Sequence, residues 1–369
     1  MTTLTAPSQS TESAKALPAL EFLGVPVRSF NVEITNRCTL RCPECSRTDN
    51  SWVRDNLTQL PLSLLERIFL VSERPRWLGL KINLCGTYGD CIYHTRFHDV
   101  VAHLKAAGLN VMIETNGSHR LIPWWEKTCA LLDDNDAITF SVDGLEDTNH
   151  IYRINSRWSD IVAAMEYCAT RVFVSWKFIV FRHNEHQIEQ ARTLARQLGV
   201  QDITFKKSAR FREGDPLAPQ SDNYIGVVNQ NRRMIRRVRS AGLPATELDQ
   251  KISIRPNCLS GKGLAITALG YLYPCTNCES ADTSTWFYKN REYFDLRRYS
   301  VADILGSRQW RDLEARWLRA STAPGTCAHT CGVHRDFIKG YDAAVRQDRP
   351  NKPDDVIRVA FPRDPGTHY

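Results

Sequence analysis

The sequence contains no apolar run near the roughly 18 residues that a helix needs to cross a bilayer. Its first 28 residues lack the basic and then apolar order of a signal peptide. Aromatic and basic residues are not interleaved as they are in proteins that stack nucleic-acid bases. These absences predict a cytoplasmic protein with no membrane partner, and they argue against a nucleic acid as partner.

Composition sets the scale of the protein. The chain of 369 residues exceeds the usual size of one hydrophobic core, which predicts one large domain and a smaller one. The net charge of +7 is spread along the chain, which favours an ordinary solvated surface. Twelve cysteines in an intracellular protein indicate metal sites rather than disulfides.

Strand-like and helix-like segments alternate between residues 30 and 207. The strands are expected over 31–35, 80–85, 110–115, 137–142, 172–181 and 202–207. Gly108 and Gly199 follow two of the intervening helices, where glycine commonly ends a helix. Repeated βα units predict an α/β fold, a partial (β/α)6 barrel with its helices outside a parallel sheet. Ligands of such sheets bind at the carboxyl ends of the strands.

The expected domain boundaries follow from this pattern. Residues 1–28 are a flexible N-terminal segment, 29–245 the barrel, 246–340 a small cysteine-rich domain and 341–369 a C-terminal tail. The tail is rich in proline, and we expect it to lie on the surface or to be disordered. Helices are predicted over 221–242, which is basic, and over 301–320, where Trp310, Leu313 and Trp317 share one face.

Three cysteines lie on one short loop directly after the first predicted strand. They are Cys38, Cys42 and Cys45, in the spacing Cys-x3-Cys-x2-Cys. Thiolates hold iron–sulfur clusters, and a loop with three of them leaves one iron of a cubane cluster open to a small molecule. A zinc knuckle is the alternative, but no fourth Cys or His follows within thirty residues.

This loop resembles that of the radical S-adenosylmethionine (radical SAM) enzymes. The resemblance implies a SAM-binding [4Fe–4S] cluster and a 5′-deoxyadenosyl radical that removes a hydrogen atom from the substrate. It also implies SAM contacts at Gly86, Thr87, Tyr88, Gly89, Asp90, Thr115, Asn116, Ser141, Asp143, Arg153 and Lys177. The residue before the third cysteine is usually aromatic and packs on the adenine. Here it is Glu44, which retains only the backbone contact.

A second group of cysteines follows in the C-terminal third of the chain. Their order resembles the Twitch and SPASM domains, which hold extra [4Fe–4S] clusters behind a radical SAM barrel. A full SPASM domain has more cysteines, so the five here imply one auxiliary [4Fe–4S] cluster. Its implied ligands are Cys258, Cys275, Cys327 and Cys331, with Cys278 either spare or replacing one of them. A zinc ribbon built from the same cysteines is the alternative.

Further predictions concern the substrate. Four basic residues at the end of the last predicted strand are candidates to receive a phosphate or carboxylate: Lys206, Lys207, Arg210 and Arg212. At most two of them are expected to contact it, because side chains alternate along a strand. Cys91, beside the glycine-rich segment, is a candidate hydrogen-atom donor, although a buried structural thiol is the simpler interpretation.

The resemblance covers residues 30–335 and implies an enzyme reduced by a donor such as flavodoxin or ferredoxin. We expect an oxidoreductase that dehydrogenates a small polar metabolite such as a sugar or cyclitol, with the auxiliary cluster accepting the second electron. A peptide-modifying maturase and a redox-neutral radical epimerase remain open. A zinc-bearing RNA-binding protein is the alternative from a different class.

Overall fold

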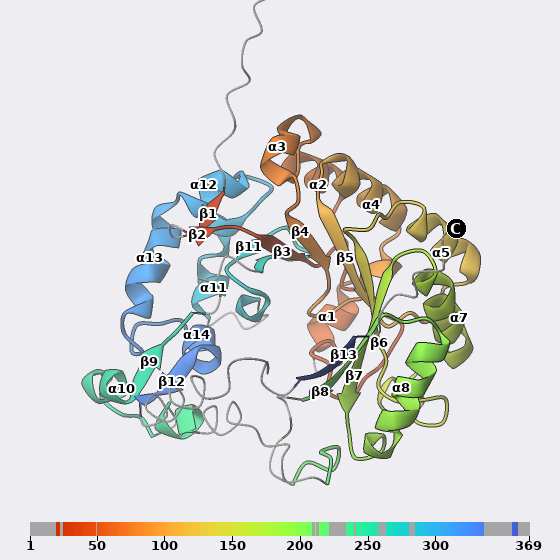
Figure 1. Ribbon diagram of the computed structural model, residues 1–369. Helices are drawn as coiled ribbons and strands as arrows, with labels where there is room; N and C mark the ends of the chain where they lie inside the picture. Colours follow the sequence, from red (N-terminus) through yellow and green to blue (C-terminus); the bar gives the residue numbers. More distant parts are fainter. Residues whose placement is uncertain are drawn as a thin grey trace, which may run out of the picture.

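In the computed structural model, one nine-stranded sheet organises the chain (Figure 1). Its order is β11-β10-β3-β4-β5-β6-β7-β8-β13, and the strands from β3 to β8 are parallel neighbours. These six are β3 (Ser29–Val32), β4 (Lys81–Leu84), β5 (Asn110–Thr115), β6 (Ala137–Ser141), β7 (Phe173–Val180) and β8 (Asp202–Lys207). The predicted partial (β/α)6 barrel is confirmed, and only β3 departs from its expected range by more than one residue.

The structure describes residues 20–22, 25–48, 50–208, 211, 214–220, 234–239, 241–256, 258, 263–279, 285–335 and 356–360. Most of the segment expected to be flexible over 1–28 lies outside this part of the chain, apart from a short hairpin of β1 (Glu21–Phe22) and β2 (Val25–Pro26). Most of the basic helix expected over 221–242 lies outside it as well. Arg210 and Arg212 are not described, and neither is the side chain of Lys207.

Helices cover the outer face of the parallel strands (Figure 1). The longer ones are α2 (Leu62–Ile68), α4 (Phe97–Ala106), α5 (Ile122–Cys129), α7 (Trp158–Ala169) and α8 (Ile188–Gln197), with α1 (Ser51–Asp55), α3 (Arg74–Trp77) and α6 (Asn149–Tyr152) between them. Helix α4 buries Val100, Val101 and Leu104, which recur at helical spacing. The chain leaves it through Gly108, whose φ of 91° suits glycine alone among common residues.

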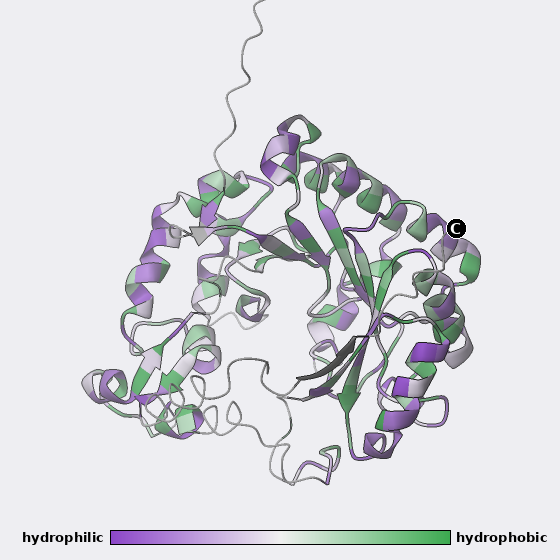
Figure 2. Cartoon of the chain, in the orientation of Figure 1, coloured by the Kyte–Doolittle hydropathy of each residue, from purple (hydrophilic) through white to green (hydrophobic). Residues whose placement is uncertain are grey.

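Alternate residues of each strand face the interior of the barrel. In β7, Trp176 and Phe178 are fully buried on the side where α7 packs, whereas Lys177 and Ile179 point the other way and are only half-buried. Figure 2 shows the same division at larger scale, with hydrophobic colour along β5 to β7 and hydrophilic colour on the outward sides of α8 and α13. The helix-covered face of the sheet thus forms the hydrophobic core, and the inner face can hold the polar side chains of a site.

The cysteine-rich region adds strands to the barrel sheet. β10 (Leu264–Ile266) pairs in parallel with β3, and β11 (Leu272–Tyr273) pairs antiparallel with β10. The region also contains β9 (Ile252–Ile254), β12 (Gly332–His334), α10 (Ala245–Lys251), α11 (Trp286–Lys289), α12 (Val301–Leu305), α13 (Arg308–Trp317) and α14 (Gly325–Thr330). One hydrophobic core includes residues of both regions, among them Phe30, Ile266 and Trp310. The C-terminal region therefore extends the barrel rather than standing apart from it.

Two sequence-based expectations are corrected by the structure. The single helix expected over 301–320 is two helices, because the Ser307 hydroxyl accepts the Trp310 N–H at 3.2 Å and starts a new one. The tail expected over 341–369 contributes β13 (Val356–Ala360), which pairs antiparallel with β8. An open edge of β8 would leave N–H and C=O groups unpaired, and a β-branched segment satisfies them. No helix in the described part of the chain is long and apolar enough to cross a membrane.

The shared sheet and core generate a prediction about truncation. Ending the chain after residue 245 would expose the edge of β3 and the apolar surface that β10 and α13 cover. We expect this truncated protein to be insoluble or to lose cooperative thermal unfolding, because both regions share one core. Soluble yield and circular-dichroism melting of the truncated and full chains provide the measurement. A truncated chain that melts cooperatively at the temperature of the full chain would contradict the shared core.

Candidate active site at the carboxyl ends of the strands

A cavity of about 240 Å³ opens at the carboxyl ends of the barrel strands. Its wall combines the cysteine loop after β3, the glycine-rich segment after β4 and the ends of β5, β6 and β7. The residues that line it are Cys38, Leu40, Cys42, Cys45, Arg47, Cys85, Gly86, Thr87, Tyr88, Gly89, Asp90, Glu114, Thr115, Asn116, Ser141, Tyr152, Arg153 and Ile179. The fold therefore gathers most of the residues indicated by the sequence around one space.

Hydrogen bonds fix the cysteine loop at the edge of this cavity. The Leu40 N–H donates to Cys38 Sγ over 3.4 Å, and the Asn116 amide donates to the same sulfur over 3.8 Å. The Thr48 hydroxyl donates to the Cys42 carbonyl oxygen over 2.8 Å. The three thiols are thus presented from a loop that is ordered by its own contacts.

Burial determines the charge of two of these thiols. It raises the pKa of Cys38 to about 12, with a further contribution from the Asp90 carboxylate. Burial also raises the pKa of Cys42, although the nearby Arg153 guanidinium opposes the rise. Both sulfurs are therefore thiols at neutral pH, and a bound metal would have to displace their protons.

Glu33 holds the glycine-rich segment from behind. Its Oε1 accepts the N–H groups of Tyr88 at 2.7 Å and Gly89 at 2.9 Å. Glycine is required at position 89, because a Cβ there would lie 1.9 Å from the Thr35 carbonyl oxygen. Two N–H groups of the glycine-rich segment are thus bonded to Glu33. These bonds hold the backbone of the segment in place without a ligand.

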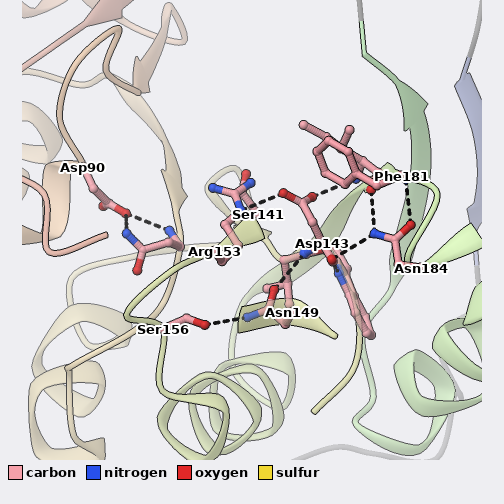
Figure 3. A network of polar contacts seen from close by, with 12 residues as sticks. Asp90, Ser141, Asp143, Asn149, Arg153, Ser156, Phe181 and Asn184 are labelled. Atoms are coloured by element: carbon pink, nitrogen blue, oxygen red, sulfur yellow. Dashed lines mark hydrogen bonds and ion pairs between the residues drawn. The ribbon is translucent and has the colours of Figure 1, made fainter. Parts of the chain in front are cut away.

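Asp90 connects three strand-end loops. Its N–H donates to the Arg37 carbonyl oxygen at 2.8 Å, and its Oδ2 accepts the Thr115 hydroxyl at 3.0 Å and the Asn116 N–H at 2.7 Å. Figure 3 shows the dashed hydrogen bonds that reach the Asp90 carboxylate. Burial raises the pKa of Asp90 to about 6, while these hydrogen bonds oppose the rise. The carboxylate that the resemblance assigned to SAM is in fact fully engaged within the protein.

Arg153 is held in place by Asp143. Its Nε lies 2.7 Å from Asp143 Oδ2, and the Asp143 side chain has no exposed surface (Figure 3). The other carboxylate oxygen of Asp143 accepts the Ile179 N–H at 2.8 Å, and the Asn184 amide donates to the Asp143 carbonyl oxygen at 2.9 Å. Burial works against the charge of Arg153, but Asp143 and the Cys42 sulfur raise its pKa overall. The arginine is therefore charged and fixed beside Cys42 at the cavity wall.

An ion pair crosses the interior face of the barrel. Lys177 on β7 pairs with Glu114 at the end of β5, and the Ser141 hydroxyl donates to the same carboxylate at 3.4 Å. Burial would raise the pKa of Glu114, but the charges of Lys177 and Lys206 lower it overall. Lys177 itself does not line the cavity, so its place in the site is next to Glu114 rather than against a ligand.

Other candidates from the sequence also lie outside the cavity wall. Glu44 and Asp143 are not among the lining residues. Cys91 is 2% exposed and its sulfur donates to the Glu114 carbonyl oxygen at 3.6 Å, so this thiol is not placed to reach a substrate. Cys85 does line the cavity, and its sulfur donates to Asn31 Oδ1 at 3.7 Å.

Glu33, Cys85 and Glu114 are the residues that sequence reasoning missed. Asn31 and Glu33 lie at alternate positions of the first barrel strand and its continuation, on the side that faces the interior. Glu114 lies at the carboxyl end of β5, the third barrel strand. Polar residues at alternate positions of otherwise apolar strands were the available signal.

The second group of cysteines also comes together in the structure. Cys275 and Cys278 have their sulfurs 3.6 Å apart, and Cys278 forms a hydrogen bond with Cys327. Burial raises the pKa of Cys258, with the charges of Cys275, Cys327 and Cys331 adding to the rise. In the described part of the chain, no group of three or more His, Cys, Asp or Glu side chains is arranged so that it could hold a single metal ion. Cys278 lies inside this group and is not apart from it.

Two buried acidic residues, Glu33 and Glu279, interact with each other. Burial raises the pKa of Glu33 to about 7, and its Oε2 has no hydrogen-bond partner among the described residues. Burial and the charge of Glu33 together raise the pKa of Glu279 well above its usual value, while the Thr87 hydroxyl opposes the rise. Glu279 directly follows Cys278, so this pair connects the glycine-rich segment to the auxiliary cysteines.

The donor groups present fit the cofactors that the resemblance implies. Three thiols on one loop and a glycine backbone face the same cavity, and a fixed arginine lies at its wall. Sulfur ligands suit an iron–sulfur cluster, and a charged guanidinium suits a carboxylate.

The raised pKa of Glu33 predicts a pH-dependent stability. The pKa of Glu33 is about 7 in the folded protein and about 4.5 in the unfolded chain, because burial disfavours the charged carboxylate. The neutral carboxyl group therefore contributes its full stabilisation of the fold below about pH 4.5, and this stabilisation is lost as the pH rises through 7. A shift of this size corresponds to about 3 kcal/mol. Glu33→Gln keeps an oxygen for the Tyr88 and Gly89 N–H groups and removes the buried charge.

We therefore expect Glu33→Gln to melt several degrees above the wild type at pH 8 and close to it below pH 4.5. Thermal unfolding of the reduced, metal-free proteins between pH 4.5 and 8 measures this difference. The exposed Glu126→Gln is the matched control and should follow the wild type at every pH. A Glu33→Gln difference that is constant across this range would show that ionisation of Glu33 carries no penalty.

Comparisons with known proteins agree with this geometry. Residues 32–195 match the model of the Radical SAM superfamily. A curated relative, the tungsten-containing aldehyde ferredoxin oxidoreductase cofactor-modifying protein of Pyrococcus furiosus, is 23% identical over 203 residues. That alignment covers 53% of this chain and 53% of the relative, so the chain spans about half the length of the curated relative it matches.

Two solved structures share the fold. SuiB of Streptococcus suis is 11% identical with a TM-score of 0.54, and the alignment covers 78% of this chain and 67% of SuiB. Native anSMEcpe with bound AdoMet is 10% identical with a TM-score of 0.50, over 86% of this chain and 97% of that one. The family model thus covers the cysteine loop and the strands β4 to β7, and the two solved structures show that the fold is shared.

Proposed function

We propose that this enzyme cleaves SAM reductively at a [4Fe–4S] cluster held by Cys38, Cys42 and Cys45, and that it oxidises a small polar metabolite. The observation that carries the proposal is that three thiols from one loop line the same cavity as the glycine-rich segment. When bound, the cluster supplies one electron to SAM, whose cleavage yields the radical that takes a hydrogen atom from the substrate.

The residues of the chain bind and orient the reactants. The backbone of 86–90, fixed by Glu33, provides polar groups for the amine of SAM. Arg153, fixed by Asp143, provides the charge for its carboxylate. Thr115, Asn116 and Ser141 line the remaining wall and supply hydrogen bonds to the ribose or the carboxylate. Such fixed positions matter because hydrogen-atom transfer needs the reacting carbon held in one place.

A second cluster in the C-terminal region belongs to the proposal. Cys258, Cys275, Cys327 and Cys331 interact with one another through space, and Cys278 lies among them. We assign Cys258, Cys275, Cys327 and Cys331 as ligands, with Cys278 as the alternative to one of them. A cluster there would accept the second electron of an oxidation. The first electron comes from a carrier such as flavodoxin or ferredoxin.

The metal content tests the two cluster sites together. The anaerobically reconstituted protein should bind about eight irons and eight sulfides, two cubane clusters. Changing Cys38, Cys42 and Cys45 together to Ala should halve both numbers. Iron and acid-labile sulfide analysis provides the measurement, and a wild-type count near four would remove the auxiliary cluster.

Reductive cleavage of SAM tests the first cluster alone. With dithionite and SAM, the wild type should form 5′-deoxyadenosine slowly even without substrate, whereas the triple cysteine variant should form none. Chromatography with mass spectrometry quantifies the product. The variant with Cys129→Ala is a matched control, because this cysteine is buried beside Cys168 and does not line the cavity. Cleavage by the triple variant would place the chemistry elsewhere.

A further inference from the structure

Three cations and two carboxylates meet near the carboxyl ends of β5 to β8. Arg153 is paired with Asp143, and Lys177 is paired with Glu114. Lys206 has no ion-pair partner among the described residues. Glu114, whose carboxylate feels the charge of Lys206, is already taken by Lys177. Among the described residues, the Lys206 ammonium therefore has no carboxylate of its own.

The position of Lys206 in the sheet indicates where its charge can act. Lys206 stands beside Ile179 in the register of β7 and β8, so the two side chains share the interior face of the barrel. Ile179 lines the cavity, whereas Lys206 and Lys177 do not. The Lys206 ammonium, for which no ion-pair partner is found in the described part of the chain, thus lies next to the proposed SAM pocket but outside its wall.

We infer that Lys206, with Lys177 beside it, forms a subsite for an anionic group of the substrate, a phosphate or a carboxylate. A half-buried ammonium without a counter-ion is unfavourable, and a bound anion supplies the missing charge. Burial and the charge of Lys177 lower the pKa of Lys206, and the Glu114 carboxylate opposes this only in part. The inference deepens the proposed function, since it restricts the small polar metabolite to anionic compounds.

The geometry also separates this subsite from the carboxylate of SAM. Arg153 lines the cavity and lies close enough to the Cys42 thiol to affect its pKa. Lys206 is one strand beyond β7 and interacts with Glu114 and Lys177. An anion at Lys206 therefore leaves the arginine free for SAM, and both are expected to bind at once.

Calorimetric titration of the anaerobically reconstituted protein tests the subsite. Inorganic phosphate and succinate serve as probes, each with and without saturating SAM. We expect at least one probe to bind the wild type, with SAM present or absent. Tighter binding of phosphate would indicate a phosphate ester as substrate, and tighter binding of succinate a carboxylate.

Two variants of Lys206 make the test specific. Lys206→Met keeps the length of the side chain without its charge and should weaken binding about tenfold or more. Lys206→Arg keeps the charge and should retain most of the affinity. Lys127→Gln, at an exposed position of α5, is the matched control and should bind as the wild type does.

Three outcomes would overturn the subsite. They are equal affinity in the wild type and Lys206→Met, no heat of binding for either probe, and loss of probe binding when SAM is present. The last would assign Lys206 to the SAM carboxylate. The proposed function is judged separately by 5′-deoxyadenosine formation in the wild type. A protein that cleaves SAM but binds neither probe contradicts only the subsite.

Discussion

The rest of the site depends on the hydrogen bonds of the buried Asp90. The carboxylate accepts hydrogen bonds from Thr115 and Asn116 in the loop after β5, and the backbone N–H of Asp90 donates to the Arg37 carbonyl oxygen beside the cysteine loop. A carboxylate that is only 6% exposed persists because several donors surround it. Through Asn116 the same network reaches the sulfur of Cys38. The cysteines and the glycine backbone therefore hold one relative position, as a cofactor that touches both would require.

The barrel and its working end could be predicted from the sequence, because both follow from local patterns. Repeated βα units specify a parallel sheet, and a loop after its first strand must lie at the carboxyl edge. The roles of individual side chains could not be predicted this way. Asp143 looks like a ligand contact by position, yet it is buried and serves to fix Arg153. Cys91 and Cys85 are both close to the glycine-rich segment in sequence, but Cys85 directly follows β4 and lines the cavity, whereas Cys91 begins the short 3₁₀ helix Cys91–Tyr93 and is buried.

The C-terminal region illustrates a second limit of sequence reasoning. Its cysteines suggested a domain of its own, but β10 pairs with β3 and the tail strand β13 closes the opposite edge. The β10–β3 pairing joins residues more than two hundred positions apart, and no local pattern encodes it. The consequence for function is that the auxiliary cysteines are attached to the barrel sheet itself. Glu279, next to Cys278, reaches the Thr87 hydroxyl of the glycine-rich segment.

In the proposed function, the three-cysteine loop leaves one iron of its cluster open and SAM binds there. The most direct measurement is electron–nuclear double resonance on the reduced protein with SAM labelled by ¹⁵N at its amine or ¹⁷O at its carboxylate. The account predicts hyperfine coupling of both labels to the cluster in the wild type, and in a variant that lacks Cys327 and Cys331. A reduced cluster that shows no coupling to either label, with SAM bound, would contradict it.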